Sequence, residues 1–153
     1  MIYTDLTKLA MRIAFDAHYG QTDRGGTPYI CHPLHVADQM EDEATTVIAL
    51  LHDVLEDTEV TEEDLLREGI PEEILSDVRL MTRNRELPYA NYIENMIRSG
   101  NKRVMTVKLA DIRHNLDATR IEHGRLPSHL RERYRIAEKM LVGMLEQESE
   151  EDA

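Results

Sequence analysis

The apolar and polar positions of the chain repeat at helical spacing. Residues 4–18 place apolar side chains three and four positions apart, which gives a helix one apolar face. From 19 to 32, polar residues and three glycines interrupt this spacing and predict a loop. The helical pattern resumes at Pro33, which suits the first turn of a helix, and becomes strongly apolar over 43–56. This part of the chain therefore predicts three helices and one long loop.

The rest of the chain shows the same spacing, divided by proline and glycine. Thr61 and Asp64 stand three positions apart, as in a capping box, and Gly69 is typical of a helix end. Proline is favoured in the first turn of a helix, so each later proline predicts a new start. Further helices are expected from Pro71 to about Thr82, from Pro88 to Gly100, over about 102–119 and from Pro127 onward.

Strand signals are poor, because no long run alternates polar residues with β-branched or aromatic ones. At least six helices with short connections predict an all-α fold, a compact multi-helix bundle. A chain of 153 residues suits one domain, since this length buries about 68–70% of the unfolded surface. No repeat or linker divides the chain. We expect a single domain over 1–146, followed by an acidic tail over 147–153.

Charge and composition narrow the function classes. The chain carries 30 acidic and 18 basic side chains, a net charge of −12, whereas non-specific nucleic-acid binding needs a basic face. No uncharged apolar run is long enough to predict a membrane span. The single cysteine, Cys31, excludes an internal disulfide and suits a reducing cytosol. We therefore expect a cytoplasmic protein without a signal peptide, whose partner is neither nucleic acid nor membrane.

The segment 51–58 concentrates polar chemistry on an otherwise apolar helix. His52 and Asp53 are adjacent, Glu56 follows Asp53 by three positions, and Asp57 follows it by four. On a helix these side chains flank one patch of surface. Burying them without a cation would be costly through desolvation and like-charge repulsion. The simpler alternative is a charged helix end in which a neighbour satisfies His52.

Two further segments strengthen the metal interpretation. His32 lies at a loop-to-helix junction between apolar neighbours, which would fix the direction of its ring. Asp111 stands in mid-helix among residues that favour burial, and a buried aspartate needs a partner. That partner is either a basic neighbour, Lys108 or Arg113, or a metal ion.

Two imidazoles and two carboxylates form a mixed nitrogen and oxygen ligand set. Such a set suits Mn²⁺, Fe²⁺ or Zn²⁺ better than Mg²⁺ or Ca²⁺, which prefer oxygen ligands alone. Four protein ligands leave open positions only on a five- or six-coordinate metal, which favours Mn²⁺. The open positions would take a water and a phosphate oxygen, the arrangement of metal-assisted hydrolysis. The predicted ligands are His32, His52, Asp53 and Asp111.

These residues, with their flanking motifs, resemble a known family. The four ligand positions match the HD-domain phosphohydrolases, and the wider match is to the hydrolase domain of RelA/SpoT proteins and to small alarmone hydrolases. The resemblance covers about residues 10–120. The motifs that carry it, in chain order, are 17–21, 26–34, 51–58, 108–111 and 114–115.

The resemblance implies a single HD hydrolase domain over 1–146 and a specific reaction. Enzymes of this family use Mn²⁺ to remove the 3′-pyrophosphate from guanosine tetra- or pentaphosphate, which leaves GDP or GTP. It implies that Glu56 and Asp57 position and deprotonate the attacking water. It also implies a nucleotide partner, held by Lys108, by Asn115 at the sugar and by Arg24 beside the guanine. The length leaves no room for a synthetase domain, so we expect no bifunctional enzyme.

Three departures from the family pattern keep other functions open. Asp23, Ile112 and Asp117 stand where the family is usually basic, which reduces the positive charge available to a substrate with four or five phosphates. One alternative is an HD-domain phosphatase acting on another nucleotide, such as a nucleoside monophosphate or NADPH. Another is a metal- or nucleotide-binding module without turnover. The sequence leaves the oligomeric state open.

The sequence also predicts roles for several other side chains. Cys31 is expected to be small and buried, and His18 to brace its loop rather than bind metal. His114 is expected either to hold Asp111 or the substrate, or to pack behind the site. The basic spots at 82–85 and 102–103 are expected in solvated turns, although one of them could meet the distal phosphates of a substrate.

Overall fold

The computed structural model describes residues 1–120 and 126–152, and over these residues it contains helices and no strand. The predicted all-α fold is confirmed. One isolated bridge, between Thr22 and Pro28, closes the loop that follows the first helix. The elements are α1 (Asp5–Ala17), α2 (Cys31–Asp38), α3 (Glu43–Leu51), α4 (Val54–Asp57), α5 (Glu62–Glu68), α6 (Glu72–Met81), α7 (Tyr89–Ser99), α8 (Lys102–Asn115), the 3₁₀ turn η1 (Ala118–Arg120) and α9 (Ser128–Glu151).

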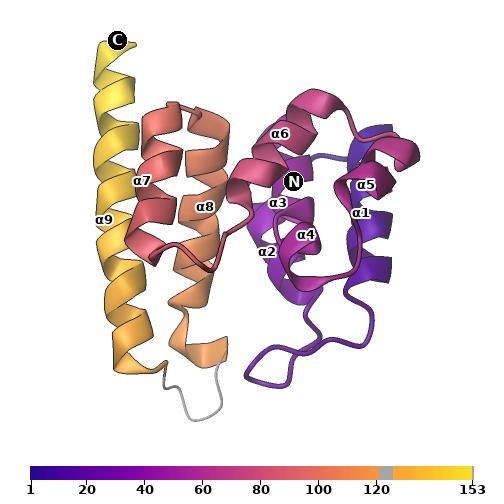
Figure 1. Ribbon diagram of the computed structural model, residues 1–153, viewed down its shortest axis with the longest axis horizontal. Helices are drawn as coiled ribbons and strands as arrows, with labels where there is room; N and C mark the ends of the chain where they lie inside the picture. Colours follow the sequence, from indigo (N-terminus) through magenta and orange to yellow (C-terminus); the bar gives the residue numbers. More distant parts are fainter. Residues whose placement is uncertain (121–125, 153) are drawn as a thin grey trace.

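The helices form two groups that meet along α8. Figure 1 shows α7, α8 and α9 side by side, with α1 to α6 gathered beyond α8. At the centre lies α3, which contacts α1, α2, α6 and α8 and buries every residue from Thr45 to Leu51. Its sequence is apolar on all sides, as expected of a helix surrounded by others. Because α2, α3 and α8 pack against one another, polar residues on these three helices can meet in the interior.

The helix ends follow the predicted signals. Thr61 and Asp64 form a capping box at the start of α5, where each side chain accepts the backbone N–H of the other. Gly69 ends α5 with a φ of 107°, a left-handed conformation that favours glycine. The remaining predicted starts are also confirmed, since the residues immediately before α6, α7 and α9 are Pro71, Pro88 and Pro127.

The predicted continuous helix over 43–56 is wrong, because the chain breaks at His52 and Asp53 between α3 and α4. The Nδ1 atom of His52 donates a hydrogen bond of 2.5 Å to the Ala49 carbonyl. In an unbroken helix that carbonyl would accept from the backbone N–H of Asp53, so the side chain competes with the backbone. The break turns both side chains toward the interior, and it falls in the segment singled out for its chemistry.

Three smaller expectations are also corrected. The second helix begins at Cys31 rather than at Pro33, and the Cys31 side chain is exposed rather than buried, since the next two residues, His32 and Pro33, are the ones that α2 turns inward. The helix expected over 102–119 ends at Asn115. There Asp117 accepts hydrogen bonds from the backbone and hydroxyl of Thr119, which starts the separate turn η1.

The last helix continues beyond the predicted domain boundary. The acidic residues from 147 to 151 belong to α9, and Asp152 lies 3.8 Å from the Nζ atom of Lys102 at the start of α8. The boundary at residue 146 stays a prediction, and residue 153 lies outside the described residues. Over the described part of the chain, none of the helices has the length and apolar character needed to cross a membrane.

Candidate metal centre and active site

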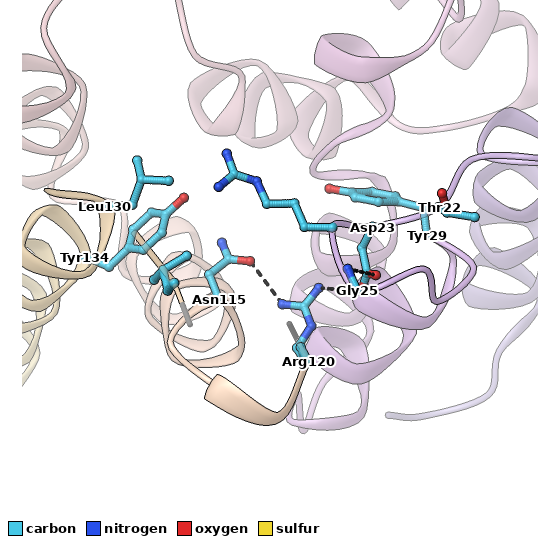
Figure 2. A pocket seen from close by; sticks show the side chains of 10 residues that line it. Thr22, Asp23, Gly25, Tyr29, Asn115, Arg120, Leu130 and Tyr134 are labelled. Atoms are coloured by element: carbon cyan, nitrogen blue, oxygen red, sulfur yellow. Dashed lines mark hydrogen bonds and ion pairs between the residues drawn. The ribbon is translucent and has the colours of Figure 1, made fainter. Parts of the chain in front are cut away.

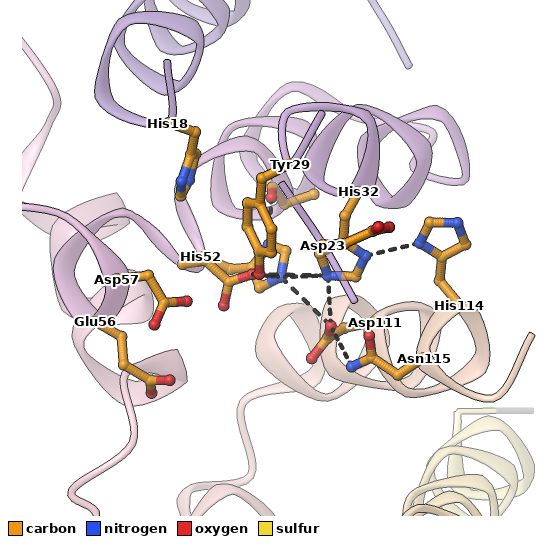
Figure 3. A network of polar contacts seen from close by, with 12 residues as sticks. His18, Asp23, Tyr29, His32, His52, Glu56, Asp57, Asp111, His114 and Asn115 are labelled. Atoms are coloured by element: carbon orange, nitrogen blue, oxygen red, sulfur yellow. Dashed lines mark hydrogen bonds and ion pairs between the residues drawn. The ribbon is translucent and has the colours of Figure 1, made fainter. Parts of the chain in front are cut away.

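The four predicted ligands meet between α2, α3 and α8. The Nε2 atoms of His32 and His52 lie 3.2 Å apart. Asp53 Oδ2 lies 3.0 Å from His52 Nε2, and Asp111 Oδ1 lies 2.9 Å from His32 Nε2. Ligand atoms of His32, His52 and Asp53 all fall within 4.8 Å of one another, and Asp111 closes the group from α8 (Figure 3). Residues as far apart in the chain as 32 and 111 therefore converge on one point.

The donor set fits a divalent cation. Because His52 Nδ1 donates to the Ala49 carbonyl, Nε2 is the nitrogen that faces Asp53 and the other imidazole, and its lone pair is the one that a metal ion would take. Burial lowers the pKa of His52, but the charges of Asp53 and Asp111 outweigh it and raise that pKa well above its usual value. The carboxylates thus draw positive charge to this point, which a metal ion held by two nitrogens and two oxygens would supply.

Asp111 has partners on both of its oxygens. Its Oδ2 atom accepts from Lys108 Nζ at 2.6 Å, while Oδ1 faces His32 and also accepts from Asn115 Nδ2 at 3.2 Å. Burial raises the pKa of Asp111, but the charges of Lys108 and His52 reverse this and hold it well below its usual value. Arg113, the other basic neighbour, pairs with Glu138 instead. Lys108 and the ligand cluster therefore share Asp111.

Two side chains hold the ligands in place from behind. The hydroxyl of Tyr29 donates to Asp53 Oδ2 at 2.5 Å, and its burial beside Asp53 raises its pKa far above the ordinary value, so it remains a donor. His114 Nδ1 lies 2.7 Å from His32 Nδ1, and burial with the nearby charge of Arg120 lowers the pKa of His114 to about 3. His114 thus lies behind a ligand, one of the two roles expected for it.

The contact of Tyr29 with Asp53 was not predicted from the sequence. Tyr29 precedes His32 by three positions, but no regular helix joins the two residues, and only the fold shows that both side chains reach the same carboxylate cluster.

His18 holds its loop in place, as expected. Its Nδ1 atom lies 2.9 Å from Gln21 Oε1, and Gln21 donates to the carbonyl of Asp57 at 3.0 Å.

Glu56 and Asp57 line a cavity of about 420 Å³ together with three of the four predicted ligands, His32, Asp53 and Asp111. Burial, followed by the negative charges of Asp53 and Glu56, raises the pKa of Asp57 to about 6. Glu56 accepts from the backbone N–H of Arg83 at 2.8 Å and from Arg85 Nη2 at 3.3 Å. The basic turn at 82–85 therefore contacts the candidate active site, whereas we expected it to lie in solvent.

Two of the three predicted substrate residues, Arg24 and Asn115, border an adjoining cavity of about 270 Å³. Figure 2 shows Asn115 and Tyr134 on one side of it and Tyr29 on the other. Arg24 lines both this cavity and the metal cavity, as do Asn115 and Tyr134. Lys108 lines only the metal cavity. The two cavities are therefore neighbours, and aromatic and amide side chains border both of them.

The three departures from the family pattern have local structural partners. Asp23 accepts from the backbone N–H groups of Gly25 and Thr27, and it pairs with Arg120 at 3.5 Å. Arg120 also donates to Asn115 Oδ1 at 3.2 Å (Figure 2). As described above, Asp117 starts η1. Ile112 is fully buried in the core. Asp23 therefore lies in the cavity wall with its negative charge balanced by Arg120.

Comparisons with known proteins agree with this geometry. The family model described as "HD domain" matches residues 10–141. The guanosine-3′,5′-bis(diphosphate) 3′-pyrophosphohydrolase of Borreliella burgdorferi is 39% identical over 120 residues, which are 70% of this chain and 18% of that protein. The enzyme of the same name from Haemophilus influenzae is 40% identical over 116 residues, 68% of this chain and 17% of that protein. This chain thus spans less than a fifth of these relatives.

A solved structure matches over nearly the whole chain. It is described under the words "A metazoan ortholog of SpoT hydrolyzes ppGpp and plays a role in starvation responses". The match has a TM-score of 0.73 and 26% sequence identity, and it covers 95% of this chain and 88% of the other. The resemblance to RelA/SpoT hydrolase domains is confirmed, and the chain belongs to the HD domain family.

Proposed function

We propose that the protein is a metal-dependent phosphohydrolase that acts on guanosine tetra- and pentaphosphate, (p)ppGpp. The products are pyrophosphate and GDP or GTP. The observation that carries this proposal is one cavity whose wall holds Glu56 and Asp57 together with three members of the predicted ligand cluster, which are His32, Asp53 and Asp111. The names of the matched relatives and of the matched structure support the choice of substrate.

We assign Mn²⁺ as the metal, held by His32, His52, Asp53 and Asp111. The mixed nitrogen and oxygen donors support a transition metal over Mg²⁺ or Ca²⁺. When bound, such an ion lowers the pKa of a coordinated water and polarises a phosphoryl oxygen. Tyr29 and His114 would keep the ligands oriented through their hydrogen bonds to Asp53 and His32.

The acidic pair would handle the water. Asp57, with a pKa of about 6, is deprotonated at neutral pH and basic enough to take a proton from the attacking water. Glu56, fixed by Arg83 and Arg85, would orient that water. The water oxygen bonds to phosphorus, the bond from phosphorus to the ribose oxygen breaks, and the ribose oxygen takes up a proton.

The nucleoside would lie along the adjoining cavity. Asn115 would contact the sugar, Arg24 would lie beside the base, and Lys108 would help to neutralise phosphate charge near the metal. We place the protein in the cytoplasm, where its nucleotide substrate is made and where the exposed thiol of Cys31 stays reduced.

The direct test is hydrolysis by purified protein. The protein is stripped with a chelator and reloaded with Mn²⁺, metal content is measured, and ppGpp is added. We expect release of pyrophosphate in a one-to-one ratio with GDP. A parallel panel contains a nucleoside monophosphate and NADPH, assayed for orthophosphate. If the metal-loaded protein leaves ppGpp intact, the proposed substrate is wrong, and turnover of a panel member would identify a different phosphatase.

A further inference from the structure

Two arginines share one tyrosine ring in the wall of the metal cavity. The Arg83 guanidinium carbon lies 5.2 Å from the centre of the Tyr89 ring, and that of Arg133 lies 4.9 Å from it. Arg83 follows α6, Tyr89 begins α7 and Arg133 belongs to α9. All three residues line the cavity that holds the four-ligand centre. The fold therefore gathers two positive charges at one place from three separate elements.

These two guanidinium groups, together with that of Arg24, are the positive charge of the cavity that no carboxylate pairs with in the described part of the chain. Lys108 pairs with Asp111, and Arg85 pairs with Glu56 and Asp57. Those two cations and a divalent metal would together match the four carboxylates of the site. Within residues 1–120 and 126–152, neither Arg83 nor Arg133 lies within ion-pair distance of a carboxylate. In a chain with a net charge of −12, leaving them unpaired beside each other is unexpected unless an anion joins them.

Hydrogen bonding at the same place is also incomplete. The Nε atom of Arg83 and the hydroxyl of Tyr89 are buried, and over the described part of the chain neither has a hydrogen-bond partner. Burial raises the pKa of Tyr89 to about 12, so its hydroxyl remains protonated and able to donate. Buried groups without partners cost stability, and a phosphoryl oxygen would accept from both.

We propose that Arg83, Tyr89 and Arg133 form a subsite for the terminal phosphoryl group of a diphosphate attached to the nucleoside. This assignment rests on the proposed function, and it extends it by naming the side chains that hold the second phosphoryl group of the diphosphate. The metal centre would take the phosphoryl group joined to ribose, and the three side chains would hold the next one. The subsite binds and orients the substrate and takes no part in breaking the bond.

The activity test compares two substrates that differ by one phosphoryl group. These are guanosine 5′-diphosphate 3′-diphosphate and guanosine 5′-diphosphate 3′-monophosphate. We expect Arg83→Gln and Arg133→Gln each to lower kcat/KM for the first by about tenfold to a hundredfold, and to change the second less than twofold. Arg83→Gln keeps the backbone N–H that Glu56 uses, so the water-binding pair is undisturbed. Equal losses on both substrates, or none on either, would overturn the assignment.

Matched variants distinguish the loss of a contact in the subsite from the loss of one positive charge anywhere on the protein. Arg135→Gln removes the same charge from the same helix at an exposed position outside the cavity, so we expect no change with either substrate. Arg133→Lys keeps the charge but loses the planar donor fork, and should recover part of the loss. Thermal unfolding of each variant identifies any that fails to fold, and the other arginine then carries the test.

A binding measurement distinguishes failure of the subsite from failure of the proposed function. Inorganic pyrophosphate is titrated calorimetrically into Mn²⁺-loaded protein, with free Mn²⁺ held equal in both solutions, and orthophosphate is titrated likewise. We expect pyrophosphate to bind more tightly, and this preference to fall about tenfold or more in the two glutamine variants. If the protein hydrolyses no nucleotide but keeps this preference, only the proposed function is wrong. If it hydrolyses ppGpp but the variants retain the preference, only the subsite is wrong.

Discussion

The metal side and the substrate side of the cavity differ in how completely their polar groups are paired. On the metal side, each of the four predicted ligands has a second partner: Ala49 for His52, Tyr29 for Asp53, Lys108 for Asp111 and His114 for His32. On the substrate side, Arg83 and Tyr89 keep buried donors without partners in the described chain. Preorganised ligands suit an ion that must be held in one geometry. Unpaired donors suit an anion that arrives and leaves with each turnover.

The largest expected effect comes from removing one of the predicted metal ligands. Asp53→Asn removes a ligand charge 3.0 Å from His52 Nε2 while keeping the size of the side chain. We expect metal affinity to fall and ppGpp hydrolysis to drop by about 1,000-fold or more, since stabilisation by a metal is worth several kcal/mol. Metal content after dialysis and pyrophosphate release measure the two effects. Asp16→Asn, on the exposed surface of α1, is the matched control, and equal behaviour of the two variants would contradict the ligand assignment.

The second prediction separates water activation from metal binding. Asp57→Asn removes the proposed proton acceptor and leaves all four ligands in place. We expect kcat to fall by about 100-fold to 10,000-fold while metal affinity and KM stay within a few-fold of the wild-type values. Single-turnover kinetics and calorimetric metal titration check this. Unchanged turnover would exclude Asp57 as the base, and cellular function that survives both Asp57→Asn and Glu56→Gln would support a binding module without turnover.

The metal side could be predicted from the sequence better than the substrate side, because its residues lie in short motifs and the contacts of the substrate side join distant parts of the chain. The four proposed ligands lie in short motifs, so the sequence and the family resemblance could predict them, and the structure brings their side chains together. The break at His52 was not predicted, because it depends on a side chain that competes for the Ala49 carbonyl. The contacts of Arg83 and Arg133 with Tyr89 were also beyond prediction, since they depend on how α6, α7 and α9 pack.

The third prediction concerns support behind a ligand. His114 Nδ1 lies 2.7 Å from His32 Nδ1, and a hydrogen bond donated by His32 Nδ1 to His114 would leave His32 Nε2 free to bind metal. We expect His114→Ala to weaken metal affinity by about tenfold to a hundredfold. His114→Asn places an amide oxygen near the lost nitrogen and should recover most of that affinity. Metal titration against a fluorescent chelator measures both variants. Equal affinities for the alanine and asparagine variants would assign His114 a packing role only.

The fourth prediction is a pH dependence of the chemical step. The pKa of Asp57 is raised to about 6, so the carboxylate is protonated and inactive as a base below that pH and deprotonated above it. We expect single-turnover rates to rise about tenfold per pH unit up to about pH 6 and to level off beyond it. Asp57→Asn should lose this lower limb of the profile. A limb that persists in the variant would assign the titration to another group.

The smallest effects compare two glycines, one on the substrate side and one away from it. A Cβ atom on Gly25 would lie 1.8 Å from the Arg120 carbonyl oxygen, so Gly25→Ala must displace the loop that Asp23 and Arg120 hold against α8. We expect it to cost about 1–3 kcal/mol of stability and to raise KM for the nucleotide. Gly143→Ala, in the middle of α9 with open space around it, should stabilise the fold by about 0.5–1 kcal/mol and leave KM unchanged. Denaturant unfolding and steady-state kinetics measure both, and a KM that stays constant in Gly25→Ala would show that the nucleotide does not depend on the loop. Because the two changes add the same methyl group, the difference between them isolates the close contact at the substrate side.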